Sequence, residues 1–188
     1  NLWYFGACDP SLGKFGKQRD PSAIGIGGFD RENGILYIVK MLIKKRLPDR
    51  IISDIIELQR QYMCIAWAIE SVQFQEFLRT ELVKRSAKMG VPVPAVPVHP
   101  HADKELRIEA LQPHCANGLI LFHTEQTTVI DQFKHFPKGG HDDGCDCVEM
   151  LHKIAQQYGQ IHQIQEIVIP EPNMYQMNFG GFGTFNNW

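Results

Sequence analysis

A nearly unbroken apolar run from Cys64 to Ile69 ends at an acidic residue, Glu70. A short run without polar alternation is typical of a strand that is buried on both faces of its sheet. Such a strand needs packed side chains above and below it, so the run favours a sheet with helices on its faces. It also places a carboxylate at the end of a buried strand.

The segments around this run predict the rest of the sheet. Residues 3–8, 23–29 and 35–43 are strand-like, and Asn33-Gly34 favours a tight turn, so they predict an antiparallel meander of three strands. Helices, a strand and an extended segment are predicted for the remainder, at 48–62, 74–90, 91–100, 103–111, 118–122, 124–133 and 147–158. This order describes an α/β domain with a mixed sheet and helices on both faces, which is the ribonuclease-H-like arrangement.

The length of the chain, 188 residues, predicts one domain with room for an appendage. We expect the ribonuclease-H-like domain to cover residues 1–160. Residues 161–188 are rich in Gln, Asn, Gly and Phe, so we expect a C-terminal extension that is flexible or ordered by a partner. Because the chain does not begin with methionine, we expect it to be a domain of a longer polypeptide.

Composition excludes several classes of protein. The chain has 19 basic and 21 acidic residues, a net charge of −2, so it has no global basic field and any contact with nucleic acid must be local. Five irregularly spaced cysteines argue against a disulfide framework and favour reduced thiols. No apolar run approaches the roughly 18 residues of a membrane span, and the first residues lack the charged region of a signal peptide. We therefore expect a cytosolic protein that is neither secreted nor bound to a membrane.

Acidic residues stand where the predicted strands end and the last helix begins. Asp9, followed by Pro10, ends the first strand and Glu70 ends the fourth, and these strands can lie side by side in a ribonuclease-H-like sheet. The start of the last helix can add Asp142 or Asp143. Three gathered carboxylates would repel one another unless a divalent cation neutralised them. Oxygen ligands suit magnesium or manganese, and two such ions would support phosphodiester hydrolysis.

Several short motifs follow one another in a specific order along the chain. They are Gly6-Ala-Cys-Asp9-Pro10, Arg19-Asp20-Pro-Ser-Ala-Ile24, Ile69-Glu70 with Phe74-Gln75, Lys104-Glu-Leu-Arg107-Ile108, Phe136-Pro137 and His141-Asp142-Asp143-Gly-Cys-Asp146. In this order, over residues 3–158, they resemble the nuclease domain of the large terminase subunit of tailed bacteriophages.

The resemblance implies a metal-dependent endonuclease that cuts double-stranded concatemeric viral DNA during genome packaging, in the cytoplasm of the host cell. Asp9, Glu70 and Asp143 fall on the family's acidic metal-binding positions, and further acids of the family correspond to Asp142, Asp20 and Asp146. The resemblance also implies a packaging ATPase domain in the same full-length polypeptide, and a portal and a small terminase subunit as partners. The chain itself contains no Gly-x-x-x-x-Gly-Lys-Ser/Thr phosphate loop.

Basic residues offer candidate contacts with DNA. Lys104 and Arg107 resemble a basic pair of the family that would contact the scissile strand or stabilise charge in the transition state. An ordinary solvated helix face accounts for them equally well. Lys14 and Lys17 lie in the most basic third of the chain and would add a local phosphate track if they share a face with the acids.

Two alternatives remain open at this level. His141, Cys145 and Cys147 are possible zinc ligands, but Cys-x-Cys without a second pair is a poor match to structural zinc sites. The second alternative is a catalytically silent ribonuclease-H-like module that binds DNA or docks on packaging partners, with the acids serving only as turn and cap residues. A requirement for manganese or magnesium would distinguish a nuclease from such a module.

Overall fold

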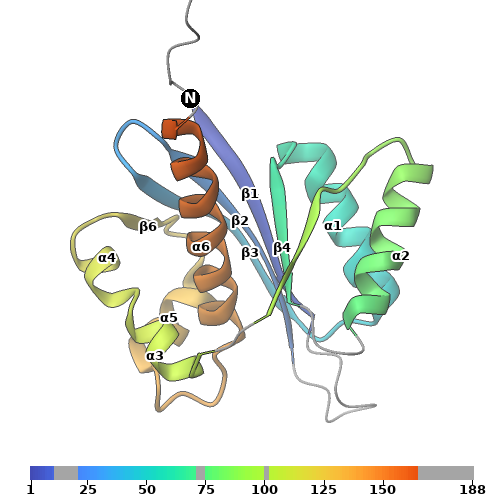
Figure 1. Cartoon of the computed structure of the whole chain (residues 1–188). Coiled ribbons are helices and arrows are strands. Elements are labelled where there is room, and N and C mark those ends of the chain that lie inside the picture. The colour runs from blue at the N-terminus through green and yellow to red at the C-terminus, as the bar shows by residue number, and fades with distance from the viewer. Residues whose placement is uncertain (11–20, 71–74, 100–101, 165–188) are drawn as a thin grey trace, which may run out of the picture.

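The computed structural model describes residues 1–10, 21–70, 75–99 and 102–164 (Figure 1). Within these residues, six strands form one mixed sheet in the order β5-β4-β1-β2-β3-β6. The strands are β1 (Leu2–Asp9), β2 (Ser22–Asp30), β3 (Ile35–Lys44), β4 (Ala66–Glu70), β5 (Ala95–Val98) and β6 (Ile120–Phe122). The helices are α1 (Pro48–Tyr62), α2 (Gln75–Lys88), α3 (Lys104–Glu109), α4 (Gln112–Ala116), α5 (Thr127–His135) and α6 (Asp143–Ile164).

The strand pairing combines a meander with parallel crossovers. β1 pairs antiparallel with β2, and β2 with β3, which confirms the predicted meander. β4 is parallel to β1, β5 to β4, and β6 to β3. The predicted α/β architecture, a mixed sheet flanked by helices, is confirmed.

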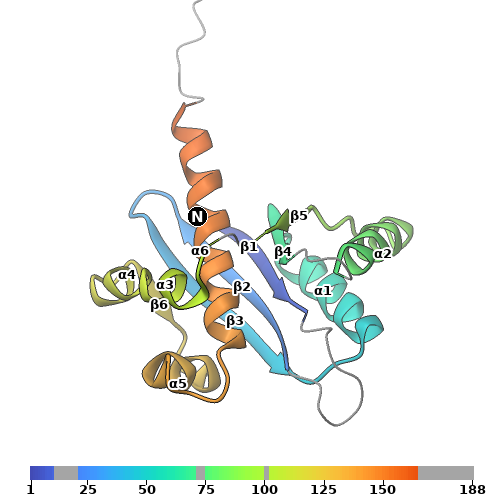
Figure 2. The same ribbon diagram turned by 60° about the horizontal axis from the view of Figure 1, so that its bottom comes forward.

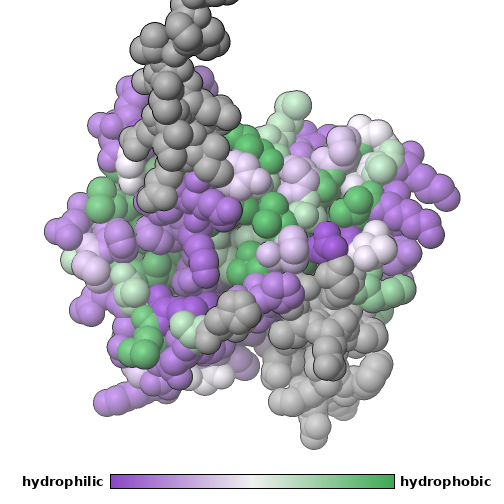
Figure 3. All heavy atoms as spheres, in the orientation of Figure 1, coloured by the Kyte–Doolittle hydropathy of each residue, from purple (hydrophilic) through white to green (hydrophobic). Residues whose placement is uncertain are grey.

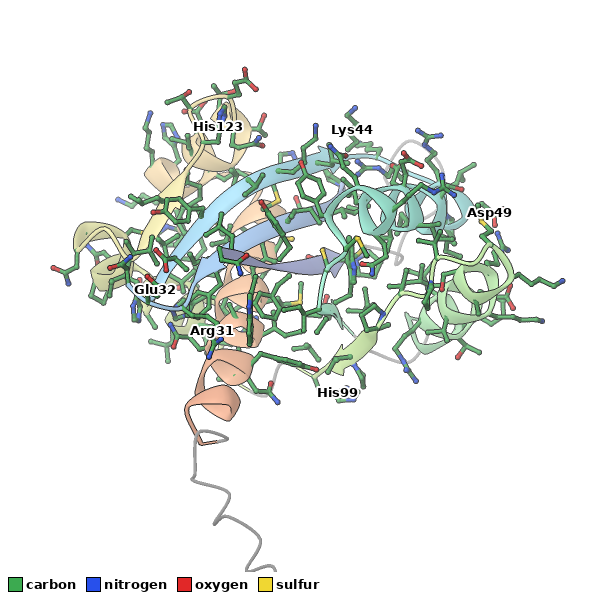
Figure 4. All side chains as sticks on the ribbon, turned by 90° about the horizontal axis from the view of Figure 1, so that it is seen from above. Arg31, Glu32, Lys44, Asp49, His99 and His123 are labelled. Carbon is green, nitrogen blue, oxygen red and sulfur yellow. The ribbon has the colours of Figure 1, made fainter. Side chains whose placement is uncertain are left out.

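Helices cover both faces of the sheet. α6 crosses one face, and α1 and α2 lie together against the other (Figures 1 and 4). The short helices α3, α4 and α5 flank α6 on its face (Figure 2). Two apolar cores follow from this arrangement, one between the sheet and α6 and one between the sheet and α1 and α2.

The β4 strand is buried on both faces, as the apolar run predicts. Ala66 and Ala68 belong to the core under α6, whereas Trp67 and Ile69 belong to the core under α1 and α2, and all four are fully buried. The Trp67 indole Nε1 donates a hydrogen bond of 2.7 Å to Gln59 Oε1 on α1. This bond fixes the ring and satisfies its buried polar atom.

Gly6 of β1 lies directly against the Trp67 ring. The two residues are register partners, and a Cβ at position 6 would lie 2.2 Å from Trp67 Cδ2. We expect Gly6→Ala to lower the free energy of unfolding by about 3 kcal/mol, because the Trp67 ring is held by its hydrogen bond to Gln59 and cannot move away from the added methyl group. Urea unfolding monitored by tryptophan fluorescence measures the change. Gly140→Ala, where a Cβ meets no atom within 4 Å, is the control. Equal stability of the two variants would contradict this packing account.

Several helix boundaries differ from the sequence prediction. The helix predicted at 103–111 is shorter, at Lys104–Glu109, and Pro113 stands in the first turn of a separate helix, α4, where its missing N–H costs nothing. The last helix begins at Asp143 rather than Cys147 and continues to Ile164. Residues 165–188 of the predicted extension lie outside the described residues. No described helix is long and apolar enough to cross a membrane.

Candidate functional site

Asp9 and Glu70 stand side by side at one edge of the sheet. The parallel pairing of β1 with β4 ends with Cys8 opposite Ile69, and each acid is the next residue of its strand. Both side chains are partly exposed. Burial raises the pKa of the Cys8 thiol, and the charges of Asp9 and Glu70 both raise it further, so the two carboxylates lie near the same sulfur. The strand register confirms that the first and fourth predicted strands are neighbours, and it places the two acids at the same end of the sheet.

The first turns of α6 are held against the same end of β1. Cys147 Sγ donates a hydrogen bond of 3.5 Å to Ala7 O, two residues before Asp9. The close approach of α6 to the sheet depends on two glycines. A Cβ on Gly25 would lie 3.0 Å from Cys147 Sγ, and a Cβ on Gly144 would lie 2.8 Å from an Ile43 methyl group. Burial raises the pKa of the Cys147 thiol, and the charges of Asp9 and Asp146 contribute. The start of α6 therefore lies near the end of the sheet that carries Asp9 and Glu70.

Three acids belong to this start of α6, but their surroundings differ. Asp143 is half-buried, and burial raises the pKa of its carboxyl above the ordinary value, with Asp142 adding to the rise. Asp142 is partly exposed, with 38 % of its side chain accessible, and Asp146 is nearly buried, at 10 %. Asp146 also shares with Glu70 and Arg107 a cavity of about 10 Å³, room for about one water molecule.

Two basic residues of α3 bind the acids of α6. Lys104 Nζ lies 2.7 Å from Asp142 Oδ1 and 2.5 Å from Asp146 Oδ2. The Arg107 guanidinium lies 3.2 Å from Asp146 Oδ1 and 2.7 Å from Glu149 Oε2. Hydrophilic side chains accordingly gather over α3 and the adjoining part of α6 in Figure 3. The predicted basic pair is thus not a free solvated face, because both side chains have acidic partners.

The described residues do not complete a metal site with three ligands. Among residues 1–10, 21–70, 75–99 and 102–164, no three His, Cys, Asp or Glu side chains are grouped to hold one ion. Asp9 and Glu70 are brought together, whereas Asp142 and Asp146 are turned to Lys104 and Arg107. Asp20, Lys14 and Lys17 lie outside the described residues. The pair of carboxylates nevertheless offers the oxygen ligands that magnesium and manganese prefer.

No protein-family model matches the sequence, and no curated protein matches it. The structure does have solved neighbours. The P22 large terminase nuclease domain superposes with a TM-score of 0.60 at 15% identity, over 82% of each chain. The chain has the ribonuclease-H-like fold. Its likeness to a phage large terminase nuclease domain, which the sequence motifs indicate, is present at the level of the fold.

Two further neighbours share this ribonuclease-H-like fold. The fowlpox virus Holliday junction resolvase superposes with a TM-score of 0.54 at 10% identity, over 82% of this chain and 99% of the resolvase. The nuclease domain of g2p, the large terminase of bacteriophage SPP1, was solved with bound Mn and superposes with a TM-score of 0.50 at 12% identity, over 82% of this chain and 86% of that one. At these identities the comparisons establish the fold.

The thiols of this ribonuclease-H-like domain do not suit a zinc site. Cys145 and Cys147 are both buried on α6, and residues two apart on a helix point in different directions. Burial raises the pKa of Cys145 to about 12 and that of Cys147 well above the ordinary value, so burial disfavours the thiolate form that binds zinc. His141 is exposed. The acids remain the better candidates for binding metal.

Sequence reasoning missed Glu149. This buried acid carries one of the two ion pairs of Arg107. Its only signal in the sequence is its spacing: Asp142, Asp146 and Glu149 follow at intervals of four and three, which places them along one side of a helix.

Proposed function

We propose that this chain is a metal-dependent endonuclease domain that hydrolyses phosphodiester bonds of double-stranded DNA. The observation that carries the proposal is the pair of acids, Asp9 and Glu70, one residue beyond the last register pair of two neighbouring parallel strands. An acidic helix start lies at the same edge, and the neighbours in fold include two terminase nuclease domains and a resolvase.

The metal-binding carboxylates in this proposal are Asp9, Glu70 and Asp143, with Asp142 and Asp146 as further acids of the site. Asp9 and Glu70 present carboxylate oxygens from the ends of β1 and β4. Asp143 presents a third carboxyl from the first turn of α6, where burial favours its neutral form until a cation is bound. Magnesium or manganese, in one or two positions, would activate a water and stabilise the leaving oxygen of the phosphodiester.

We further propose that the DNA is a viral concatemer cut during genome packaging in the host cytoplasm. The ordered motifs and the likeness in fold to the P22 and SPP1 nuclease domains support this role. It would place this domain beside a packaging ATPase domain in one polypeptide, with the portal and the small terminase subunit as partners.

Digestion of supercoiled plasmid by the purified chain tests the proposed activity. We expect nicking and linearisation in manganese, equal or slower cleavage in magnesium, little in zinc and none in EDTA, because a carboxylate site tolerates manganese geometry more readily than it meets the strict octahedral demand of magnesium. Gel electrophoresis separates the products. Full cleavage in EDTA would refute the metal-dependent mechanism, and an intact plasmid that is bound by the chain would favour a silent binding module.

A further inference from the structure

Lys104 lies between the acids at the start of α6 and makes contact with two of them. Its ammonium group bridges Asp142 and Asp146, at 2.7 and 2.5 Å. Burial alone would lower the pKa of Lys104, but its hydrogen bonds to these two carboxylates outweigh burial and raise the pKa, so the side chain is a full cation at neutral pH. The charge of Lys104 also acts on the carboxyl of Asp143. One ammonium group thus serves as the counter-cation of two of these acids, Asp142 and Asp146.

The second base, Arg107, is held much more firmly. Only 15 % of its side chain is exposed, and its partners Asp146 and Glu149 are 10 % and 11 % exposed. Separate guanidinium nitrogens bind separate carboxylates, which fixes the side chain in two directions. Arg107 therefore keeps α3 against α6 without help from Lys104.

Lys104, by contrast, is able to move away from its acidic partners. Its side chain is 43 % exposed, and its partner Asp142 is 38 % exposed. Its second partner, Asp146, is 10 % exposed but keeps Arg107 as a cation when Lys104 leaves. An ammonium on a four-carbon chain is a mobile point charge, and exposed ion pairs of this kind are weak. Loss of its contacts would not detach α3 from α6, because the Arg107 ion pairs remain. It would not unwind the first turn of α3 either, because Asp103 Oδ1 accepts from Glu105 N and Leu106 N.

We propose that Lys104 is an internal counter-cation that a divalent metal ion displaces from the acids of α6, and that the released ammonium then binds a DNA phosphate. This proposal rests on the proposed nuclease function. Lys104 holds Asp142 and Asp146, and Asp146 lines the same small cavity as Glu70, so a metal ion bound beside Glu70 would compete with Lys104 for these acids. Metal binding and DNA binding would then strengthen each other through one side chain.

Displacement of Lys104 by the metal predicts the direction in which Lys104→Met and DNA each change the affinity for manganese. Without DNA, removing Lys104 removes a competitor of the metal, so Lys104→Met should bind manganese about three- to tenfold more tightly, as expected for the loss of two weak ion pairs. In the parent chain, DNA should raise manganese affinity and manganese should raise DNA affinity by the same factor. In Lys104→Met the factor by which each ligand raises the affinity for the other should fall close to one, because no ammonium group is left to move from the acids to a DNA phosphate.

The experiment is titration calorimetry with MnCl₂ alone and then with a cleavage-resistant phosphorothioate DNA duplex present. The matched control is Lys84→Met, which removes an exposed α2 lysine, 69 % accessible, that pairs with Glu81 at 3.8 Å. Lys84→Met should match the parent chain, and Lys104→Arg, which keeps the charge, should retain most of the enhancement. Circular dichroism confirms that each variant is folded.

The outcomes separate this inference from the proposed function. Unchanged or weaker manganese binding by Lys104→Met would overturn the displacement of Lys104, as would enhancement by DNA that survives the substitution. If the parent chain binds no manganese, the proposed metal-dependent nuclease function itself is wrong. If DNA affinity falls in Lys104→Met while manganese affinity stays the same, Lys104 is a simple phosphate contact, and this inference is wrong.

Discussion

Asp9→Asn is expected to abolish plasmid cleavage, with a rate at least about a hundredfold below that of the parent chain. Loss of residues that only support a metal ligand typically costs 10–100-fold, so loss of a ligand itself should cost more. Glu70→Gln should have a comparable effect, because Glu70 ends the neighbouring strand at the same register level. Initial rates of plasmid nicking in manganese measure both losses.

The control for these variants is Glu57→Gln on α1. Its side chain is 67 % exposed and pairs with Arg60 at 3.0 Å on the helix surface, so we expect an unchanged cleavage rate. Circular dichroism should show that Asp9→Asn and Glu70→Gln remain folded. Near-normal cleavage by either variant would remove that residue from the set of metal ligands.

Arg107→Met is expected to lower the free energy of unfolding by about 3–5 kcal/mol. The substitution leaves Glu149, at 11 % exposure, without its cation, and it leaves Asp146, at 10 % exposure, with Lys104 as its one remaining cation in the described structure. Arg107→Lys should recover part of the loss, since it restores the charge but not two separate hydrogen-bonding arms. Urea denaturation at neutral pH measures these differences.

Lys104→Met is the matched comparison for this stability effect. Lys104 also binds two acids, but it is 43 % exposed, so its removal should cost less than about 1 kcal/mol. A loss of stability in Arg107→Met no larger than that in Lys104→Met would show that the Arg107 ion pairs do not stabilise the packing of α3 on α6.

The fold was predictable because its elements are marked by local patterns. The apolar run that contains β4, the turn at Asn33-Gly34 and the helical spacing over α1 each involve residues close in sequence. The pairing of Asp9 with Glu70 was also accessible, because the order of elements restricts which strands can be neighbours. Burial on both faces of β4 then follows from the two helical layers.

The surroundings of the α6 acids were not predictable in the same way. The contact of Arg107 with Glu149 joins residues 42 positions apart, and that of Cys147 with Ala7 joins residues 140 positions apart. Both contacts depend on how the helices pack on one another and on the sheet, and no local sequence pattern encodes this packing. The same holds for α4, where Pro113 fits either the end of one helix or the first turn of the next.

Anomalous diffraction from crystals of the parent chain soaked in manganese tests whether Asp9 and Glu70 hold a metal ion. We expect an anomalous peak coordinated by the carboxylates of Asp9 and Glu70, with an acid of the α6 start as a further ligand, and loss of that peak in Asp9→Asn. A soaked crystal with no peak between Asp9 and Glu70, or with manganese bound elsewhere while plasmid cleavage persists, would contradict this expectation.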